Sequence, residues 1–182
     1  MLRKGAYAAA GGLLATALAG VTLLSGTSGV HATTPVPFHK GDVFFGLGSG
    51  KIGHFAPSGT LLDTLNTTSG SFEETGMCFT ATLSLHTTNF QAATSSVFSA
   101  TGTLTKASFG SGYANPESCV VDAKGNFYYG NVDAVSNTLL KISPSGALLK
   151  KYSPAFENRG TDWIDLAANQ CTLYYTSEGS HI

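Results

Sequence analysis

Apolar and polar positions alternate in short runs along most of this 182-residue chain, and Gly, Pro, Ser and Asn separate the runs. One sequence motif recurs three times, and each copy contains a glycine at its turn. These glycines are Gly59, Gly102 and Gly146, which are 43 and then 44 residues apart. Short runs rich in β-branched and aromatic residues indicate β-strands. A period of about 40 to 50 residues is typical of a propeller blade. The pattern therefore predicts an all-β fold, a β-propeller made of four-stranded antiparallel blades.

A second sequence motif, read as strand, tight turn and strand, precedes the first motif in the repeats. The two motifs together predict where the blades lie. The blades are expected at about residues 42–65, 77–106, 118–152 and 162–182. The first would lack its inner strand and the last its outer strands, which makes about three and a third blades and predicts a truncated chain. Closed rings have about four to eight blades, and open sheet edges invite pairing. We therefore expect the ring to need a partner chain or missing blades to close.

The first 32 residues differ from the repeats. Arg3 and Lys4 precede an uncharged stretch rich in Ala and Gly, and Val30-His-Ala32 follows it. This arrangement is typical of a secretory signal peptide cleaved after Ala32, although a membrane anchor is the alternative because the stretch reaches about 20 residues. Residues 33–41, with two prolines, are expected to form an extended lead-in. We predict a secreted, extracellular protein without membrane contact after cleavage.

Charge and cysteine content narrow the expected partners and cross-links. Without Arg3 and Lys4, 8 of the 10 basic residues remain against 11 acidic ones, which argues against nucleic acid as a partner. Cys78 and Cys119 lie at similar places in successive repeats and are expected to be buried small apolar residues. A disulfide between Cys119 and Cys171 is the alternative for Cys119.

Acidic residues recur just before the predicted inner strands, at Glu74, Glu117 and Asp162. A partial ring of carboxylates at one mouth of the central channel would attract a hard cation such as Ca²⁺ or another divalent cation. With Asn131, these three are the candidate metal ligands. The alternative is that each acid caps a turn of its own blade by accepting backbone hydrogen bonds.

Other polar residues follow the second strand of each repeat. Asn89, Asn131 and Glu178 are candidate ligand or channel residues, although Asn also ends strands for conformational reasons. Trp163, the only tryptophan, is a further candidate that either stacks on a ligand or wedges between blades, and the wedge is the preferred interpretation.

Aromatic and histidine residues within the strands are expected to be structural. Each of three aromatic pairs would place one ring on either face of a strand and pack blade against blade; the pairs are Phe44-Phe45, Tyr128-Tyr129 and Tyr174-Tyr175. His54 and His86 have no acid nearby in sequence and are expected to be partly exposed strand residues.

The segments 98–104, 121–130 and 142–146 resemble the secreted bacterial six-bladed propellers of the NHL-repeat and SMP-30 (gluconolactonase-like) superfamily, in an uncharacterised subgroup. The resemblance covers nearly all of residues 42–182 and implies the fold more than an activity. Enzymes of that superfamily hold a divalent metal with a Glu, two Asn and an Asp and open lactones or hydrolyse esters, and streptogramin lyases use a His with Mg²⁺. This sequence departs from both patterns because neither ligand set can be completed in it.

No catalytic motif is present, so the catalytic residues stay unknown and the question of an enzyme stays open. The preferred hypothesis is a secreted propeller scaffold that binds a small polar ligand, a glycan or a protein on its loops or channel. The alternative is a metal-dependent hydrolase or lyase of the SMP-30/gluconolactonase or streptogramin-lyase type, acting in the central channel.

Overall fold

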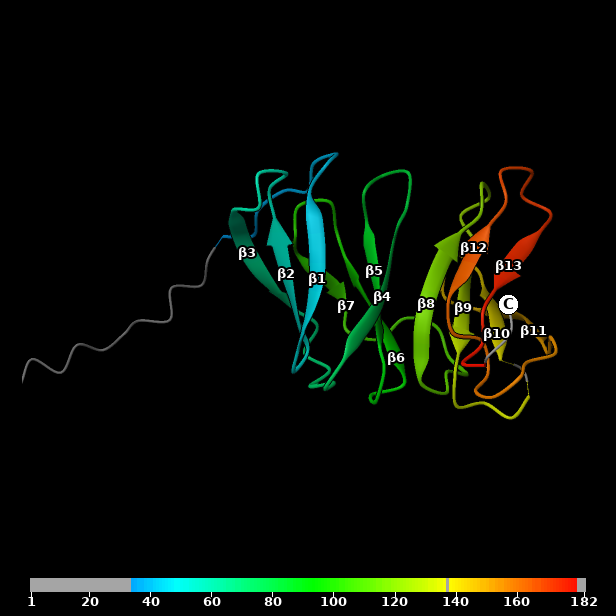
Figure 1. Cartoon of the computed structure of the whole chain (residues 1–182). Helices are drawn as coiled ribbons and strands as arrows, with labels where there is room; N and C mark the ends of the chain where they lie inside the picture. The colour runs from blue at the N-terminus through cyan, green and yellow to red at the C-terminus, as the bar shows by residue number, and fades with distance from the viewer. Residues whose placement is uncertain (1–33, 137, 180–182) are drawn as a thin grey trace, which may run out of the picture. The chain divides into compact units, whose positions relative to one another are not determined.

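The computed structural model describes residues 34–136 and 138–179, in which thirteen strands form four antiparallel sheets and no helix occurs (Figure 1). This confirms the predicted fold class, a partial all-β propeller. The predicted signal peptide with its cleavage after Ala32, and residues 180–182 of the last blade, lie outside the described part. A helix long and apolar enough to cross a membrane is not found in the described ranges.

Each strand pairs with the next strand along the chain. The first sheet contains β1 (Val43–Gly48), β2 (Lys51–Phe55) and β3 (Leu61–Asn66). The second contains β4 (Glu74–Phe79), β5 (Leu85–Asn89), β6 (Thr94–Phe98) and β7 (Leu104–Lys106). The third contains β8 (Pro116–Val121), β9 (Phe127–Asn131), β10 (Leu139–Ile142) and β11 (Leu148–Tyr152). The fourth contains β12 (Ile164–Leu166) and β13 (Leu173–Tyr175).

The turn between β8 and β9 shows why these sequences form hairpins. Asp122 Oδ1 accepts hydrogen bonds from the backbone N–H groups of Lys124 at 2.9 Å and Asn126 at 2.8 Å. Gly125 takes a φ of 78°, a left-handed conformation in which a side chain would be strained. Side-chain and backbone chemistry therefore agree on a tight turn at this point.

Hydrophobic side chains fill the spaces between successive sheets. The core between the first and second sheets contains Phe38, Ile52, Leu65, Leu85 and Phe98. The core between the second and third sheets contains Cys78, Val97, Phe109, Cys119, Phe127, Tyr129, Leu140 and Ile142. Removing such side chains from water stabilises the stack by about 1.5–3 kcal/mol for each large residue.

Two glycines let neighbouring sheets approach closely at their inner strands. A Cβ atom on Gly76 would lie 2.5 Å from the backbone oxygen of Glu117, and one on Gly130 would lie 2.6 Å from that of Thr161. No side chain fits at either position, so the contacts require glycine. They place the segments that carry Glu117 and Asp162 at the boundaries between sheets.

The disulfide joins Cys78 on β4 to Cys119 on β8, with 5.7 Å between their Cα atoms. Cys171 is free and exposed in the turn between β12 and β13. The alternative, a disulfide between Cys119 and Cys171, is therefore wrong. Cys78 and Cys119 are buried as expected, but they are bonded to each other. The physical reason is that β4 and β8 pack side by side as neighbouring inner strands.

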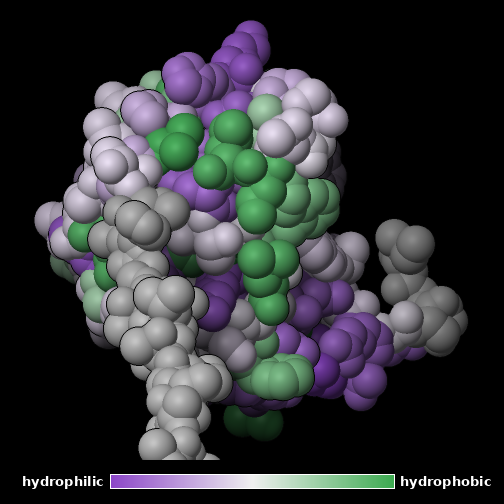
Figure 2. Space-filling view, turned by 90° about the vertical axis from the view of Figure 1, so that its left-hand side faces the viewer, coloured by the Kyte–Doolittle hydropathy of each residue, from purple (hydrophilic) through white to green (hydrophobic). Residues whose placement is uncertain are grey.

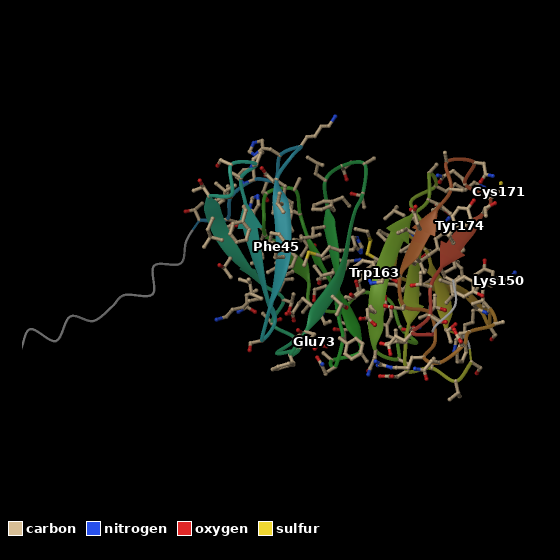
Figure 3. All side chains as sticks on the ribbon, in the orientation of Figure 1. Phe45, Glu73, Lys150, Trp163, Cys171 and Tyr174 are labelled. Atoms are coloured by element: carbon tan, nitrogen blue, oxygen red, sulfur yellow. A yellow bond between two sulfur atoms is a disulfide. The ribbon has the colours of Figure 1, made fainter. Side chains whose placement is uncertain are left out.

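The aromatic pairs divide between core and surface according to the face on which each ring lies. Phe44 stacks on His54 with 4.5 Å between ring centroids, and Tyr129 is fully buried. Phe45 of the first sheet and Tyr174 of the fourth are 56% and 61% exposed (Figure 3). These two rings were expected in the core; they are exposed because no described sheet covers their side of the first or fourth sheet.

Candidate functional site

The recurring acids do mark the inner strands, but their side chains diverge. Glu74 begins β4, Glu117 is the second residue of β8, and Asp162 lies two residues before β12. Register explains the divergence: Glu74 lies opposite Asn89, whereas Pro116, not Glu117, lies opposite Asn131. Since successive side chains on a strand point to opposite faces, the two glutamates face different neighbours.

Glu74 faces the first sheet. Its backbone oxygen and Cβ lie against Gly46, and the nearest backbone N–H groups are those of Gly48, Gly50 and Lys51. Both carboxyl oxygens are buried, and neither makes a hydrogen bond of normal geometry within the described ranges. Burial raises the pKa of Glu74, and the nearby N–H groups reduce that rise.

Glu117 faces Asp162 across the boundary between the third and fourth sheets. Burial raises the pKa of Glu117 to about 7, and the negative charges of Asp162 and Glu178 add to the rise, whereas Arg159 opposes it. The pKa of Asp162 is also raised, first by burial and then by Glu178, while its hydrogen bond with Glu117 lowers it. The two carboxyl groups therefore share a proton more readily than either would hold one alone.

One oxygen of this pair has no partner. Oε2 of Glu117 is buried and makes no hydrogen bond to any described residue. A buried carboxylate oxygen without a partner costs free energy, and the hydrogen bond of Glu117 with Asp162 leaves Oε2 in that state.

Arg159 organises the outer part of the cluster. Its Nε and Nη2 donate to Asp133 Oδ1 at 2.9 and 2.7 Å, and its Nη1 donates to Glu178 Oε1 at 2.8 Å. Asn115 donates from Nδ2 to the other oxygen of Asp133. The acidic cluster thus comprises four carboxyl groups around one guanidinium, on Glu117, Asp133, Asp162 and Glu178.

The two asparagines differ in how completely they are bonded. Asn89 is buried, and its Nδ2 donates to Thr94 Oγ1 at 2.9 Å and to Ser96 Oγ at 2.8 Å. Asn131 is equally buried and accepts from the N–H of Ala114 at 3.0 Å, but its Nδ2 has no partner in the described part of the chain. Asn89 therefore holds its own hairpin together, whereas Asn131 keeps a free donor at the end of β9.

The predicted metal-ligand set does not assemble. Glu74 faces the first sheet, whereas Glu117 and Asp162 meet at the fourth. Among the described residues, no group of three or more His, Cys, Asp or Glu side chains is placed to hold a metal ion. A Ca²⁺ ion takes six to eight oxygen ligands, so these residues do not fit a Ca²⁺ site.

Trp163 is 58% exposed and lies on the face of the fourth sheet that no described sheet covers (Figure 3). Among the described residues Trp163 is not wedged between two sheets, so the preferred interpretation as a wedge between blades stays a prediction. The exposure of Trp163 follows from alternation along β12: Ile164 is buried, so its neighbour Trp163 points to the other face.

A buried polar group at the first sheet was not predicted. The His54 ring, fully buried, contacts Asp63 Oδ1 through Nδ1 and Asp42 Oδ2 through Nε2, both at 2.9 Å. A carboxylate only accepts, so each contact requires a proton between its two atoms. The expectation of a partly exposed His54 without an acid is wrong; His54 and Asp63 pair directly across β2 and β3, which their alternation could have indicated.

These contacts also hold the lead-in segment. The backbone N–H of Val36 donates to Asp63 Oδ2 at 2.9 Å, and that of His39 donates to Asp42 Oδ2 at 2.7 Å. His86, the other strand histidine, is 4% exposed and stacks on Phe127, so it too is buried and not partly exposed. Burial lowers the pKa of His86 to about 4, which keeps its ring neutral at physiological pH.

Several solved structures share this β-propeller fold. A gluconolactonase from Xanthomonas campestris matches 70% of this chain and 41% of its own at 16% identity, with a TM-score of 0.54. Virginiamycin B lyase from Staphylococcus aureus matches 79% and 47% at 17% identity, with a TM-score of 0.63. Hydrazine synthase from Kuenenia stuttgartiensis matches 84% and 46% at 15% identity, with a TM-score of 0.64.

The chain spans less than half the length of each of these three proteins. No protein-family model matches the sequence, and no curated protein matches it in a sequence comparison. Because one fold carries three different named activities at these low identities, the likeness shows the scaffold alone.

Proposed function

We propose that this protein is a ligand-binding propeller scaffold whose acidic cluster binds a small organic cation. The observation that carries the proposal is the Glu117 carboxyl group, which has one buried oxygen without a partner and lies beside Asp162. Four carboxyl groups surround the single Arg159 guanidinium, so the cluster attracts positive charge.

The geometry favours an ammonium group over a metal ion. The carboxyl groups do not converge on one point, which a divalent cation would need. An ammonium group has three N–H donors and can reach two carboxylates that lie apart. A ligand of this kind belongs to the small polar ligands expected from the sequence.

Proton release is the signature of the proposed binding. Since the pKa of Glu117 is raised to about 7, a large fraction of its carboxyl groups is protonated at neutral pH. A bound cation favours the ionised form and displaces the proton. Binding is therefore expected to tighten as the pH rises from about 6 to 8.

Isothermal titration calorimetry with the diamine putrescine tests the proposal, and glucose serves as an uncharged comparison. We expect binding that releases protons, measured as a dependence of the enthalpy on the buffer, and at least about tenfold weaker binding in Glu117→Gln and Asp162→Asn. Glu73→Gln is the matched control, because Glu73 is an exposed acid bonded to Gln91. Equal binding by Glu117→Gln and the wild type would contradict the proposal.

A second candidate is a hydrolase or lyase of the gluconolactonase or streptogramin-lyase type. The paired carboxyl groups of Glu117 and Asp162 favour it, because a carboxyl group with a pKa of about 7 can take a proton from water and return it to a leaving oxygen. Hydrolysis of gluconolactone that disappears in Glu117→Gln but not in Glu73→Gln would support this candidate. The absence of turnover above the uncatalysed rate would exclude gluconolactone as a substrate.

We also propose export of the chain to the extracellular space. Arg3, Lys4, the apolar stretch and the Val30-His-Ala32 segment support it. Sequencing the N-terminus of the product from the culture medium is the test, and Thr33 is the expected first residue. Recovery of the uncleaved chain in the membrane fraction would favour an anchor instead.

A further inference from the structure

The outer faces of the first and fourth sheets expose residues that interior sheets bury. Phe45, Leu47 and Val43 on β1 are 56, 54 and 40% exposed, and Figure 2 shows hydrophobic residues forming a stripe on this side of the molecule. Trp163 and Tyr174 on the fourth sheet are 58 and 61% exposed. Large exposed apolar patches of this kind mark interaction sites.

Strand register shows what the face of the first sheet resembles. Val43 pairs with Phe55 across β1 and β2, just as Phe127 pairs with Ile142 across β9 and β10. Two residues further along β1 and β9, Phe45 pairs with Gly53 and Tyr129 pairs with Leu140, so Phe45 and Tyr129 occupy equivalent positions. In the third sheet, Phe127, Tyr129 and Ile142 are at most 3% exposed because the second sheet covers them.

The face of the fourth sheet matches the opposite half of the same interface. Tyr174 pairs with Asp165, as His86 pairs with Cys78 in the second sheet. His86 is the residue that stacks on Phe127 with 3.9 Å between ring centroids. Tyr174 therefore occupies the position that His86 has in the second sheet. A sheet packed on this face would place a residue equivalent to Phe127 against Tyr174, and the equivalent residue of the first sheet is Val43.

We propose that two copies of this chain associate head to tail, with the fourth sheet of each copy packed on the first sheet of the other. The face of the first sheet is equivalent to the third-sheet side of the interface between the second and third sheets, and the face of the fourth sheet is equivalent to the second-sheet side. Their charges are opposite in sign, because exposed Lys51 lies on the same face of β2 as Gly53 and Phe55, and Asp165 lies opposite Tyr174 on the fourth sheet. Two identical contacts of this kind close a ring.

Sedimentation velocity of the full chain at micromolar concentration tests the proposal. The uncleaved chain has a mass of 18.8 kDa, and we expect a species of twice the mass of the form that is measured, cleaved or uncleaved. Phe45→Glu and Tyr174→Glu, which alter opposite faces, should each raise the dissociation constant at least about tenfold. Both residues are already exposed, so the variants should fold, and circular dichroism checks this. Val135→Glu is the matched control, since Val135 is 92% exposed in a loop.

A mixture of the two variants distinguishes this arrangement from one in which like faces pair, the first sheet with the first or the fourth with the fourth. One of the two contacts in a mixed pair joins unaltered Phe45 and Tyr174, so mixing should restore part of the association. A monomer at all concentrations would overturn the proposal and leave the faces to a further blade. Association that survives either substitution, or that mixing does not restore, would overturn it as well.

Discussion

The Asp42, His54 and Asp63 group of the first sheet and the Glu117–Asp162 pair of the third and fourth both remove carboxyl groups from water, but only in the first group does each carboxyl group bond to a histidine and to a backbone N–H. His54 contacts both aspartates at 2.9 Å. The Val36 N–H bonds to the other oxygen of Asp63, and the His39 N–H bonds to the same Asp42 oxygen that His54 contacts. Glu117 keeps an oxygen without a partner and meets another acid. The first arrangement stabilises the fold, whereas the second keeps its charge available for a ligand.

The pKa shifts of the two regions run in opposite directions. Burial raises the pKa of Asp42, but the hydrogen bonds from His54 and from the His39 backbone outweigh it and leave the pKa below its usual value. Burial and like charge raise the pKa of Glu117 to about 7. A lowered pKa therefore marks a carboxyl group whose charged form stabilises the fold, and a raised pKa marks one whose charged form destabilises it.

Removing the imidazole should break the first region with the largest effect. His54→Ala leaves Asp42 and Asp63 buried without their shared partner, which is expected to lower the free energy of unfolding by about 3–5 kcal/mol. Urea unfolding measures the loss. His39→Ala is the control, since the His39 side chain is 71% exposed, and it should change stability by less than about 0.5 kcal/mol. Similar losses in both variants would contradict the structural role.

Acid should weaken the same region by protonating Asp42. Because its folded pKa is below the usual value, its contribution to stability is present above that usual value and is lost as the pH falls through the lowered one. Asp42→Asn should therefore lower the melting temperature at pH 7 and approach the wild type at low pH. A difference between the two that stays constant from pH 7 to low pH would show that the charge on Asp42 contributes nothing.

The sequence predicted the fold well because the repeat is a local property. The period set by Gly59, Gly102 and Gly146 and the turn at Asp122 depend on residues close together in the chain. Sheet order then follows from chain order, as each strand pairs with the next. The fold class needed no knowledge of long-range contacts.

The site was harder to predict because it depends on which way each side chain faces. A spacing of 43 residues made Glu74 and Glu117 look equivalent, yet a one-residue difference in register turns them to opposite neighbours. The disulfide between Cys78 and Cys119 likewise depends on two inner strands lying side by side. Arg159, whose bonds to Asp133 and Glu178 complete the cluster, occurs in no repeated motif and was not predicted.

Neutralising Glu117 should sharpen the contrast between the regions. The folded state favours the protonated form, so the wild type is expected to lose about 1 kcal/mol as the pH rises from about 4.5 through 7, after allowance for solvent screening. Glu117→Gln should remove this loss and unfold at higher urea concentration than the wild type at pH 8. Glu73→Gln should keep the wild-type slope. A flat wild-type profile would contradict the raised pKa of Glu117.

Arg159 provides the smallest effect on stability and the most specific test of the cluster. Its ion pairs with Asp133 and Glu178 are more than one third exposed, so Arg159→Ala should change the free energy of unfolding by less than about 1 kcal/mol. The pKa of Glu117 should nevertheless rise further, because Arg159 is the positive charge that lowers it. Carbon-13 NMR titration of the Glu117 carboxyl group measures the shift. Lys150→Ala, which removes a cation that packs on Tyr152 in the outer strand β11, should leave that pKa unchanged. A lower or unchanged pKa of Glu117 in Arg159→Ala would show that the guanidinium does not act on Glu117 and Asp162. The acidic cluster would then present more negative charge to a ligand than its ion pairs with Arg159 suggest.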